Sequence, residues 1–154
     1  MKRRVYVMDC GGFVKIGVSL NTEQRRKQLP CGVNQYYCTE PIDNAFEIEG
    51  FMHKVYAPLN RKCEMGSEYF NSEFARVCDV LKSAIESTEE KRKQIESAVI
   101  ELSSEGKEGF DNDFYKFVEI VLKFSVPDLT FIMFIMQGLK ARSALLNREL
   151  DERR

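Results

Sequence analysis

Two runs of β-forming residues flank a Gly-Gly dipeptide near the start of the chain, at residues 4–10 and 13–18. The first run alternates with a period of two, which is typical of a β-strand. Gly11-Gly12 suits a two-residue turn, because such turns require positive φ, which glycine tolerates. The pattern predicts an antiparallel hairpin in which Met8 lies opposite Lys15. Any fold of this chain has to accommodate that hairpin.

The remaining elements are marked by capping residues, prolines and hydrophobic periodicity. Asn21-Thr22 and Asn71-Ser72 provide helix starts, and Pro30 and Pro58 end helices. In the helix before Pro58 the apolar positions, Phe46 among them, are close to helical spacing. The expected elements after the hairpin are a helix at 22–29, a strand at 36–39, a helix at 44–56, an extended piece at 68–70, and helices at 73–86, 88–102, 113–125 and 129–150.

These elements predict an α+β fold, with a small three-stranded antiparallel sheet flanked by helices and followed by an all-helical C-terminal region. Because strongly charged helical turns begin at Ser87, we expect a domain at residues 1–84 and a helical region at 85–154. The apolar stretch 129–136 is much shorter than the roughly 20 residues needed to span a bilayer. We expect no membrane span, and we expect these C-terminal helices to form a homo-oligomer or to bind a partner.

Composition favours a globular cytoplasmic protein. Hydrophobic residues make up 44% of the chain and charged residues 31%, which argues against wholesale disorder. With a net charge of −1, nucleic-acid binding would depend on basic clusters such as 3–4 and 25–27. Five cysteines without a CxxC spacing indicate reduced thiols, in a bacterium or a phage-infected host cell. A zinc site remains an alternative, although its spacings match no common motif; it would use Cys31, Cys38, His53 and Cys63.

Tyr6 and Lys15 are expected to be diagonal neighbours on one face of the hairpin. An ammonium nearby lowers the pKa of a phenol, so Tyr6 is a candidate general base or water-positioning group. The alternative is a half-buried strand tyrosine beside a solvated lysine. Arg25 follows on the next helix, where its guanidinium either reaches a phosphate or is solvated with its basic neighbours.

Glu49 and His53 lie four residues apart, so they share one face of the helix at 44–56. A carboxylate holds Mg²⁺ or Mn²⁺ through oxygen, which makes Glu49 a candidate metal ligand. His53 is the only histidine in the chain. It either bonds to a phosphate or leaving-group oxygen, supports another ligand, or packs. Phosphodiester hydrolysis needs a base, a cation, a metal and a rigid frame, and these residues supply such a set.

The ordered motifs Val5-Tyr6-Val7, Lys15-Ile16-Gly17, Arg25 and Glu49-x-x-x-His53 resemble the GIY-YIG endonuclease superfamily. The similarity is to the phage-associated branch whose second triplet is KIG. That branch also tends to close with a G-E-W-F-like segment, to which Gly66-Ser67-Glu68-Tyr69-Phe70 is similar with one inserted residue. The resemblance covers about half of the chain and implies a three-stranded antiparallel sheet flanked by helices.

The resemblance also implies roles for individual residues. Tyr6 would activate or place water, Arg25 would follow the second motif, and Glu49 would be the ligand of a single Mg²⁺ or Mn²⁺. Lys15 stands where most members carry a tyrosine. Further positions that match the branch, or are candidates for its late asparagine, are His53, Arg61, Asn60 and Asn71.

We therefore expect a metal-dependent DNA endonuclease encoded by a phage or a mobile element. The alternative is a catalytically inactive, nuclease-like protein that binds DNA, has a regulatory role or interacts with a host protein, because a fold does not guarantee its usual function. The argument for that alternative is the near-neutral net charge, which gives little nonspecific affinity for DNA.

Overall fold

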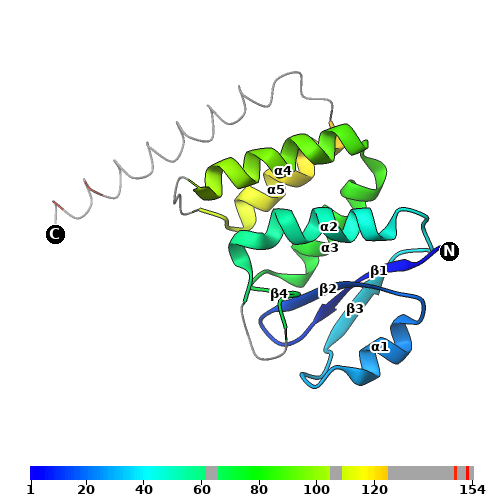
Figure 1. Ribbon diagram of the computed structural model, residues 1–154. Coiled ribbons are helices and arrows are strands. Elements are labelled where there is room, and N and C mark those ends of the chain that lie inside the picture. The colour runs from blue at the N-terminus through cyan, green and yellow to red at the C-terminus, as the bar shows by residue number, and fades with distance from the viewer. Residues whose placement is uncertain (62–65, 105–108, 125–147, 149–151, 153–154) are drawn as a thin grey trace. The chain divides into compact units, whose positions relative to one another are not determined.

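The structure is a computed structural model that describes residues 1–61, 66–104 and 109–124, together with Arg148 and Glu152 (Figure 1). The chain divides into two units, Met1–Phe124 and Ser125–Arg154. The first unit holds every helix and strand discussed below. The expected helix at 129–150, and with it the expected oligomer contact, lies outside the described residues.

The predicted hairpin is confirmed. Strands β1 (Arg4–Asp9) and β2 (Val14–Ser19) pair antiparallel, with Met8 opposite Lys15. The turn places its two glycines at φ 82° and 91°, as a two-residue turn of this kind requires. Both strands carry buried side chains on both faces, since helices cover the sheet from either side.

The sheet has four strands, where the sequence predicted three. β3 (Gln35–Cys38) pairs with β1, and β4 (Tyr69–Phe70) pairs with β2, which gives the antiparallel order β3-β1-β2-β4. The fourth strand was expected only as an extended piece, because two residues are too few to show alternation. β4 pairs only with the first two residues of β2, so it leaves the later part of that edge to another element.

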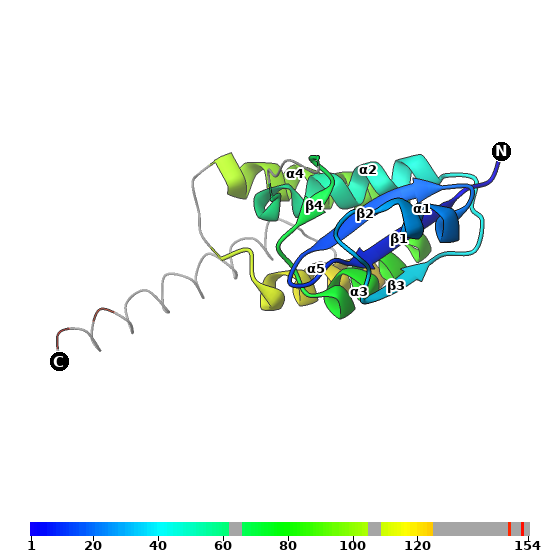
Figure 2. The same ribbon diagram turned by 90° about the horizontal axis from the view of Figure 1, so that it is seen from below.

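Helices cover the sheet in layers. Helix α1 (Thr22–Gln28) lies on one face, and α2 (Ala45–Tyr56) and α3 (Phe74–Glu86) lie on the other (Figures 1 and 2). A short 3₁₀ turn, η1 (Ala57–Leu59), follows α2. Asn21 caps α1 by accepting a hydrogen bond from the Gln24 N–H at 3.0 Å, as its residue type predicts. No described helix is long and apolar enough to cross a membrane.

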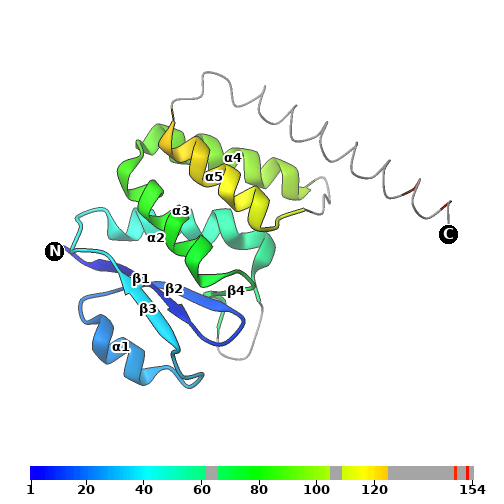
Figure 3. The ribbon, with the colours of Figure 1, turned by 180° about the vertical axis from the view of Figure 1, so that it is seen from behind.

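An outer layer is formed by α4 (Glu89–Ser104) and α5 (Asn112–Lys123), which pack on α2 and α3 (Figure 3). Tyr115 of α5 stacks on Tyr56 with ring centroids 4.1 Å apart, and its hydroxyl donates to the Val55 carbonyl at 2.9 Å. Packing is therefore continuous across residue 84. A functional division into residues 1–84 and 85–154 stays a prediction.

Phe46 does not share the buried side of α2 with the other apolar residues of that helix. Its side chain is 62% exposed, whereas Ile48 and Val55 of the same helix are fully buried. At 100° per residue, Phe46 points about 180° away from Val55, so the apparent spacing belongs to the opposite side of α2. An aromatic ring thus stands on the surface at the first turn of α2.

Candidate active site

Three residues predicted for the site line one cleft of about 390 Å³: Tyr6, Arg25 and Glu49. They come from three separate elements, β1, α1 and α2. The sequence reasoning gave their convergence as a hypothesis, and the fold brings them together. Lys15 and His53 are not among the residues that line the cleft. The other lining residues are Arg3, Gly17, Val18, Ser19, Leu20, Asn21, Gln24, Gln28 and Glu68.

Tyr6 crosses directly over Gly17, its partner on β2. A Cβ atom at position 17 would lie 2.6 Å from Tyr6 Cζ, which is closer than side chains approach. The glycine of the Lys15-Ile16-Gly17 triplet therefore provides the space in which the phenol ring lies. With Tyr6 only 1% exposed, this close approach fixes the direction in which its hydroxyl points.

Arg25 is the cation next to the Tyr6 hydroxyl. Arg25 is exposed on α1, and its Nε donates to Tyr6 Oη at 3.5 Å. Burial raises the pKa of the Tyr6 phenol above its usual value, and the hydrogen bond from Arg25 opposes this only in part. The phenol is thus protonated at neutral pH, and it can place a water or a phosphate oxygen without ionising.

The expected role of Lys15 in tuning Tyr6 is corrected by the structure. Lys15 is 3% exposed, its Nζ donates to Glu68 Oε2, and it lies 4.7 Å from the centre of the Tyr69 ring. The pKa of Tyr6 is raised rather than lowered, with burial as the largest cause and Arg25 as the cation that opposes it most. The diagonal neighbourhood was correctly predicted, but the ammonium turns to a carboxylate that is distant in sequence.

Glu49 and His53 bond to successive outward-facing backbone groups of β2. The Val18 N–H donates to the Glu49 carboxylate, and His53 Nε2 lies 3.0 Å from the Ile16 carbonyl oxygen. Because a carbonyl only accepts, Nε2 carries a proton and donates. Glu49 and His53 do share one face of α2, as predicted. Through this face α2 contacts the part of the β2 edge that β4 does not cover. His53 positions this helix, with its ring 5.4 Å from that of Phe70.

Burial also raises the pKa of Glu49 above its usual value. Positive charge on His53 opposes this rise, whereas the neighbouring Glu68 carboxylate adds to it. Two carboxylates of like charge therefore face the same cleft, an arrangement that a divalent cation relieves. Carboxylate oxygen is the ligand that Mg²⁺ and Mn²⁺ prefer, so the donor set of Glu49 and Glu68 fits such an ion.

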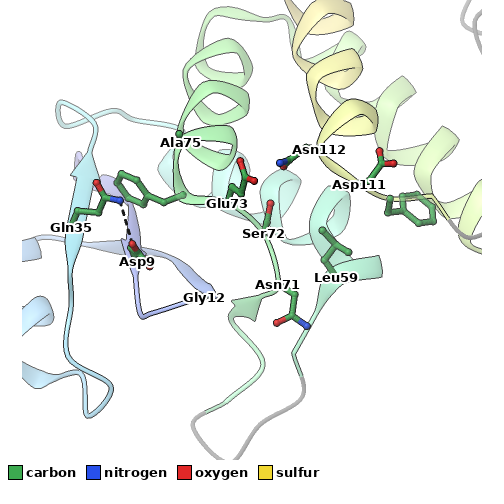
Figure 4. Close-up of a pocket in the computed structure, with 12 residues that line it drawn as sticks. Asp9, Gly12, Gln35, Leu59, Asn71, Ser72, Glu73, Ala75, Asp111 and Asn112 are labelled. Atoms are coloured by element: carbon green, nitrogen blue, oxygen red, sulfur yellow. Dashed lines mark hydrogen bonds between the residues drawn. The ribbon is translucent and has the colours of Figure 1, made fainter.

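Glu68 is the site residue that sequence reasoning did not single out. The segment around it was noted for its similarity to a closing motif, but no role was assigned to its carboxylate. Of the two candidates for a late asparagine, Asn60 donates from Nδ2 to the Ser67 carbonyl and so holds this segment next to η1. Asn71 lines a different cavity (Figure 4).

That second cavity is larger, at about 750 Å³, but its chemistry is unsuited to a phosphate backbone. It contains the carboxylates of Asp9, Glu73 and Asp111, and no lysine or arginine belongs to its described lining (Figure 4). A polyanion is repelled by such a surface. The smaller cleft, which contains Arg3 and Arg25, is therefore the better site for a nucleic acid.

A zinc centre is not found within the described part of the chain. Cys10, Cys31, Cys38 and Cys78 are free thiols, and no three described His, Cys, Asp or Glu side chains gather as a metal site. Cys63, which the zinc alternative requires, lies outside the described residues.

Comparison with known proteins identifies a family. No curated protein and no solved structure matches the chain. A profile of the T5orf172 domain matches residues 4–87, which is more than half of the chain and runs from β1 to the end of α3. This range contains Tyr6, Arg25, Glu49 and Glu68. Of the residues that line the cleft, only Arg3 precedes it. The chain therefore belongs to the T5orf172 domain family, whose domain is phage-associated and nuclease-like.

Proposed function

We propose that this protein is a DNA endonuclease of the GIY-YIG type that hydrolyses phosphodiester bonds with the help of Mg²⁺ or Mn²⁺. The observation that carries the proposal is the convergence of Tyr6, Arg25 and Glu49, from three elements, on one cleft. Membership of a nuclease-like family supports the same reaction class.

Each side chain has a role that its surroundings favour. Arg25 is exposed on its helix and neutralises charge that builds on the phosphate oxygens during attack. Tyr6 positions the attacking water through its neutral hydroxyl, since burial keeps its pKa high. Lys15 does not touch the substrate; it orients Glu68 through their ion pair.

Glu49 and Glu68 are the residues that would hold the metal ion. When bound, Mg²⁺ or Mn²⁺ supplies charge neutralisation and orientation of the phosphate. The Val18 N–H fixes the Glu49 carboxylate, and Lys15 fixes that of Glu68. These bonds leave further oxygen lone pairs on both carboxylates for a ligand.

A plasmid-nicking assay tests this function. Purified protein is incubated with supercoiled plasmid and Mg²⁺ or Mn²⁺, beside the variants Glu49→Gln and Glu90→Gln. We expect Glu49→Gln to nick at least about 100-fold more slowly, and we expect Glu90→Gln, an exposed change on α4, to nick like the parent. Nicking that survives Glu49→Gln would exclude this site.

A second function has one observation in its favour. Lys15 stands at the position where a tyrosine is usual in the resembled superfamily, and a lysine has no hydroxyl to offer; its ammonium is buried and paired with Glu68. The protein would then bind DNA, regulate or engage a host protein without cutting. An intact plasmid over a wide range of metal and salt, together with a persistent gel shift, is the outcome that selects DNA binding without cutting.

We also propose self-association through the C-terminal segment, on the basis of its sequence alone. The stretch at 129–150 is rich in apolar side chains: Leu129, Ile132, Met133, Ile135, Met136, Leu139 and Leu145. Sedimentation of the full chain at tens of micromolar, roughly the range in which weak interfaces form, is expected to show a dimer or larger species. A monomer alone would contradict this.

A further inference from the structure

We propose that the rim of the cleft holds an unpaired base on the ring of Phe46, so that the substrate is DNA with a displaced or bulged nucleotide rather than a regular duplex. The proposal rests on the function proposed above and names the substrate class of the same site. It starts from exposed apolar side chains that the fold does not use.

Phe46 is the first observation. Its side chain is 62% exposed at the first turn of α2, and it precedes Glu49 by three residues, so the two lie on neighbouring positions of one helix side. The ring contacts the Arg3 guanidinium, and the rest of its surface is open to solvent. Such a ring offers a π-face on which any base can stack.

Arg3 connects this ring to the cleft. Its guanidinium carbon lies 5.1 Å from the centre of the Phe46 ring, and Arg3 itself lines the cleft. Its backbone is held by two hydrogen bonds with Ile42, at 2.8 and 3.1 Å. The platform therefore has a fixed position, with a cation placed where the phosphate next to a stacked base would lie.

Two acidic side chains close to Phe46 in sequence are paired with cations. Asp43 pairs with Lys2 at 3.5 Å, and Glu47 pairs with the buried Arg92. Asp43 and Glu47 are thus matched by cations, whereas the Glu49 carboxylate faces the cleft. Arg3 is left to act on a phosphate, since no salt bridge is formed by it within the described part of the chain.

Leu20 forms the other rim. It is 54% exposed, it follows β2 directly, and it lines the cleft together with Glu49. The end of β2 and the start of α2 lie at the same end of the sheet (Figures 1 and 3). An exposed apolar side chain here can occupy the space that a displaced base leaves in the stack. The nuclease-like family of the domain favours a nucleic acid over a protein as the occupant of this cleft.

Equilibrium binding tests the inference without relying on cutting. The full chain is titrated, in EDTA, onto a fluorescent duplex and onto the same duplex with one bulged 2-aminopurine. We expect the parent to bind the bulged DNA at least about fivefold more tightly, and to quench 2-aminopurine, because stacking of one base contributes that much or more. Phe46→Ala should lose both effects, while Phe46→Tyr should keep them.

Ile100→Ala is the matched control, because Ile100 is 59% exposed on α4 away from the cleft; we expect it to keep the preference. Equal affinity of the parent for both DNAs would overturn the inference. A preference for bulged DNA that survives Phe46→Ala would also overturn it, and would mean that the Phe46 ring does not bind the base. A bulge preference in a protein that cuts neither plasmid nor the bulged duplex in Mg²⁺ or Mn²⁺ supports this inference while refuting the endonuclease function.

Discussion

At the scale of single residues, the closest constraint is the passage of the Tyr6 ring over Gly17. We predict that Gly17→Ala destabilises the protein by about 1–3 kcal/mol, because the added Cβ would overpack a buried site. The new methyl would meet Tyr6 Cζ at 2.6 Å. Any nicking should also fall sharply, since the hydroxyl is displaced from Arg25. Urea denaturation and the plasmid assay measure the two effects.

Gly50 provides the control for this prediction. It lies within α2, and a Cβ built on it meets nothing within 4 Å. Gly50→Ala should therefore stabilise the protein by about 0.5–1 kcal/mol through helix propensity. If both alanine variants behave alike, the special status of Gly17 is refuted.

We predict that the ionised Glu49 carboxylate lowers the stability of the folded protein at neutral pH. Its folded-state pKa is raised by burial, so the folded protein binds its proton more tightly than the unfolded chain does. The stability that this proton contributes is fully present below the pKa of Glu49 in the unfolded chain. It is lost as the pH rises through the pKa of Glu49 in the folded protein. We expect Glu49→Gln to unfold at a higher temperature than the parent at pH 7.

The same comparison at low pH is the internal control. Below the unfolded pKa of a glutamate the parent carboxyl is neutral, so the difference between parent and variant should shrink. Thermal unfolding at several pH values from acid to neutral measures it. A Gln variant that is less stable at pH 7 would show that Glu49 is held by favourable charge contacts instead.

Sequence reasoning at this scale succeeded where local order carries the information. The order and spacing of the motifs, together with the superfamily that they resemble, grouped Tyr6, Arg25 and Glu49, and these three residues line one cleft. Sequence reasoning did not find Glu68 as a cleft residue or the burial of Lys15, because their ion pair joins residues 53 apart and depends on where β4 pairs. The direction of the Tyr6 pKa was wrong because burial of the phenol, which raises its pKa, depends on how the whole fold packs around it.

At the scale of elements, α2 acts as a cover for the free edge of β2. We predict that His53→Ala costs about 1–3 kcal/mol, since it leaves the Ile16 carbonyl without its donor. His53→Gln, which retains an N–H donor, should restore part of the loss. Lys116→Ala, an exposed change on α5, should change stability by no more than about 0.5 kcal/mol. Chemical denaturation compares the three.

The same variants separate positioning from direct catalysis. If His53 acts by placing α2, and with it Glu49, then nicking should fall in His53→Ala and recover in His53→Gln alongside stability. A glutamine variant with native stability and no nicking would instead assign His53 a direct contact with the DNA.

Element prediction from sequence was most successful where end signals were explicit. Asn21 and the Gly-Gly turn fixed a helix start and the hairpin, and both are observed. The two-residue β4 had no periodic signal, and its existence depends on pairing with distant β2. Phe46 was counted with the other apolar positions of α2, because a near-helical spacing does not tell which side of the helix faces the sheet.

At the scale of the molecule, the folded unit extends beyond the range that defines the family. The matched residues end at 87, yet α4 and α5 bury side chains of α2 and α3. Arg92 of α4 is 5% exposed and donates to the Ala84 and Ser87 carbonyls at 3.1 and 2.6 Å. The two later helices thus complete the support under the element that presents Glu49.

This continuity predicts that a fragment of residues 1–87 is less stable than one of residues 1–124. Tyr56, which is fully buried, loses its stacking partner in the shorter fragment. In the full chain, Tyr115→Ala should cost about 3–5 kcal/mol by leaving a cavity, and Tyr115→Phe only about 1 kcal/mol by losing the bond to Val55. Urea midpoints compare all four proteins. A 1–87 fragment as stable as the longer one would mean that α4 and α5 are an accessory layer, and that the nuclease-like domain carries its own complete core.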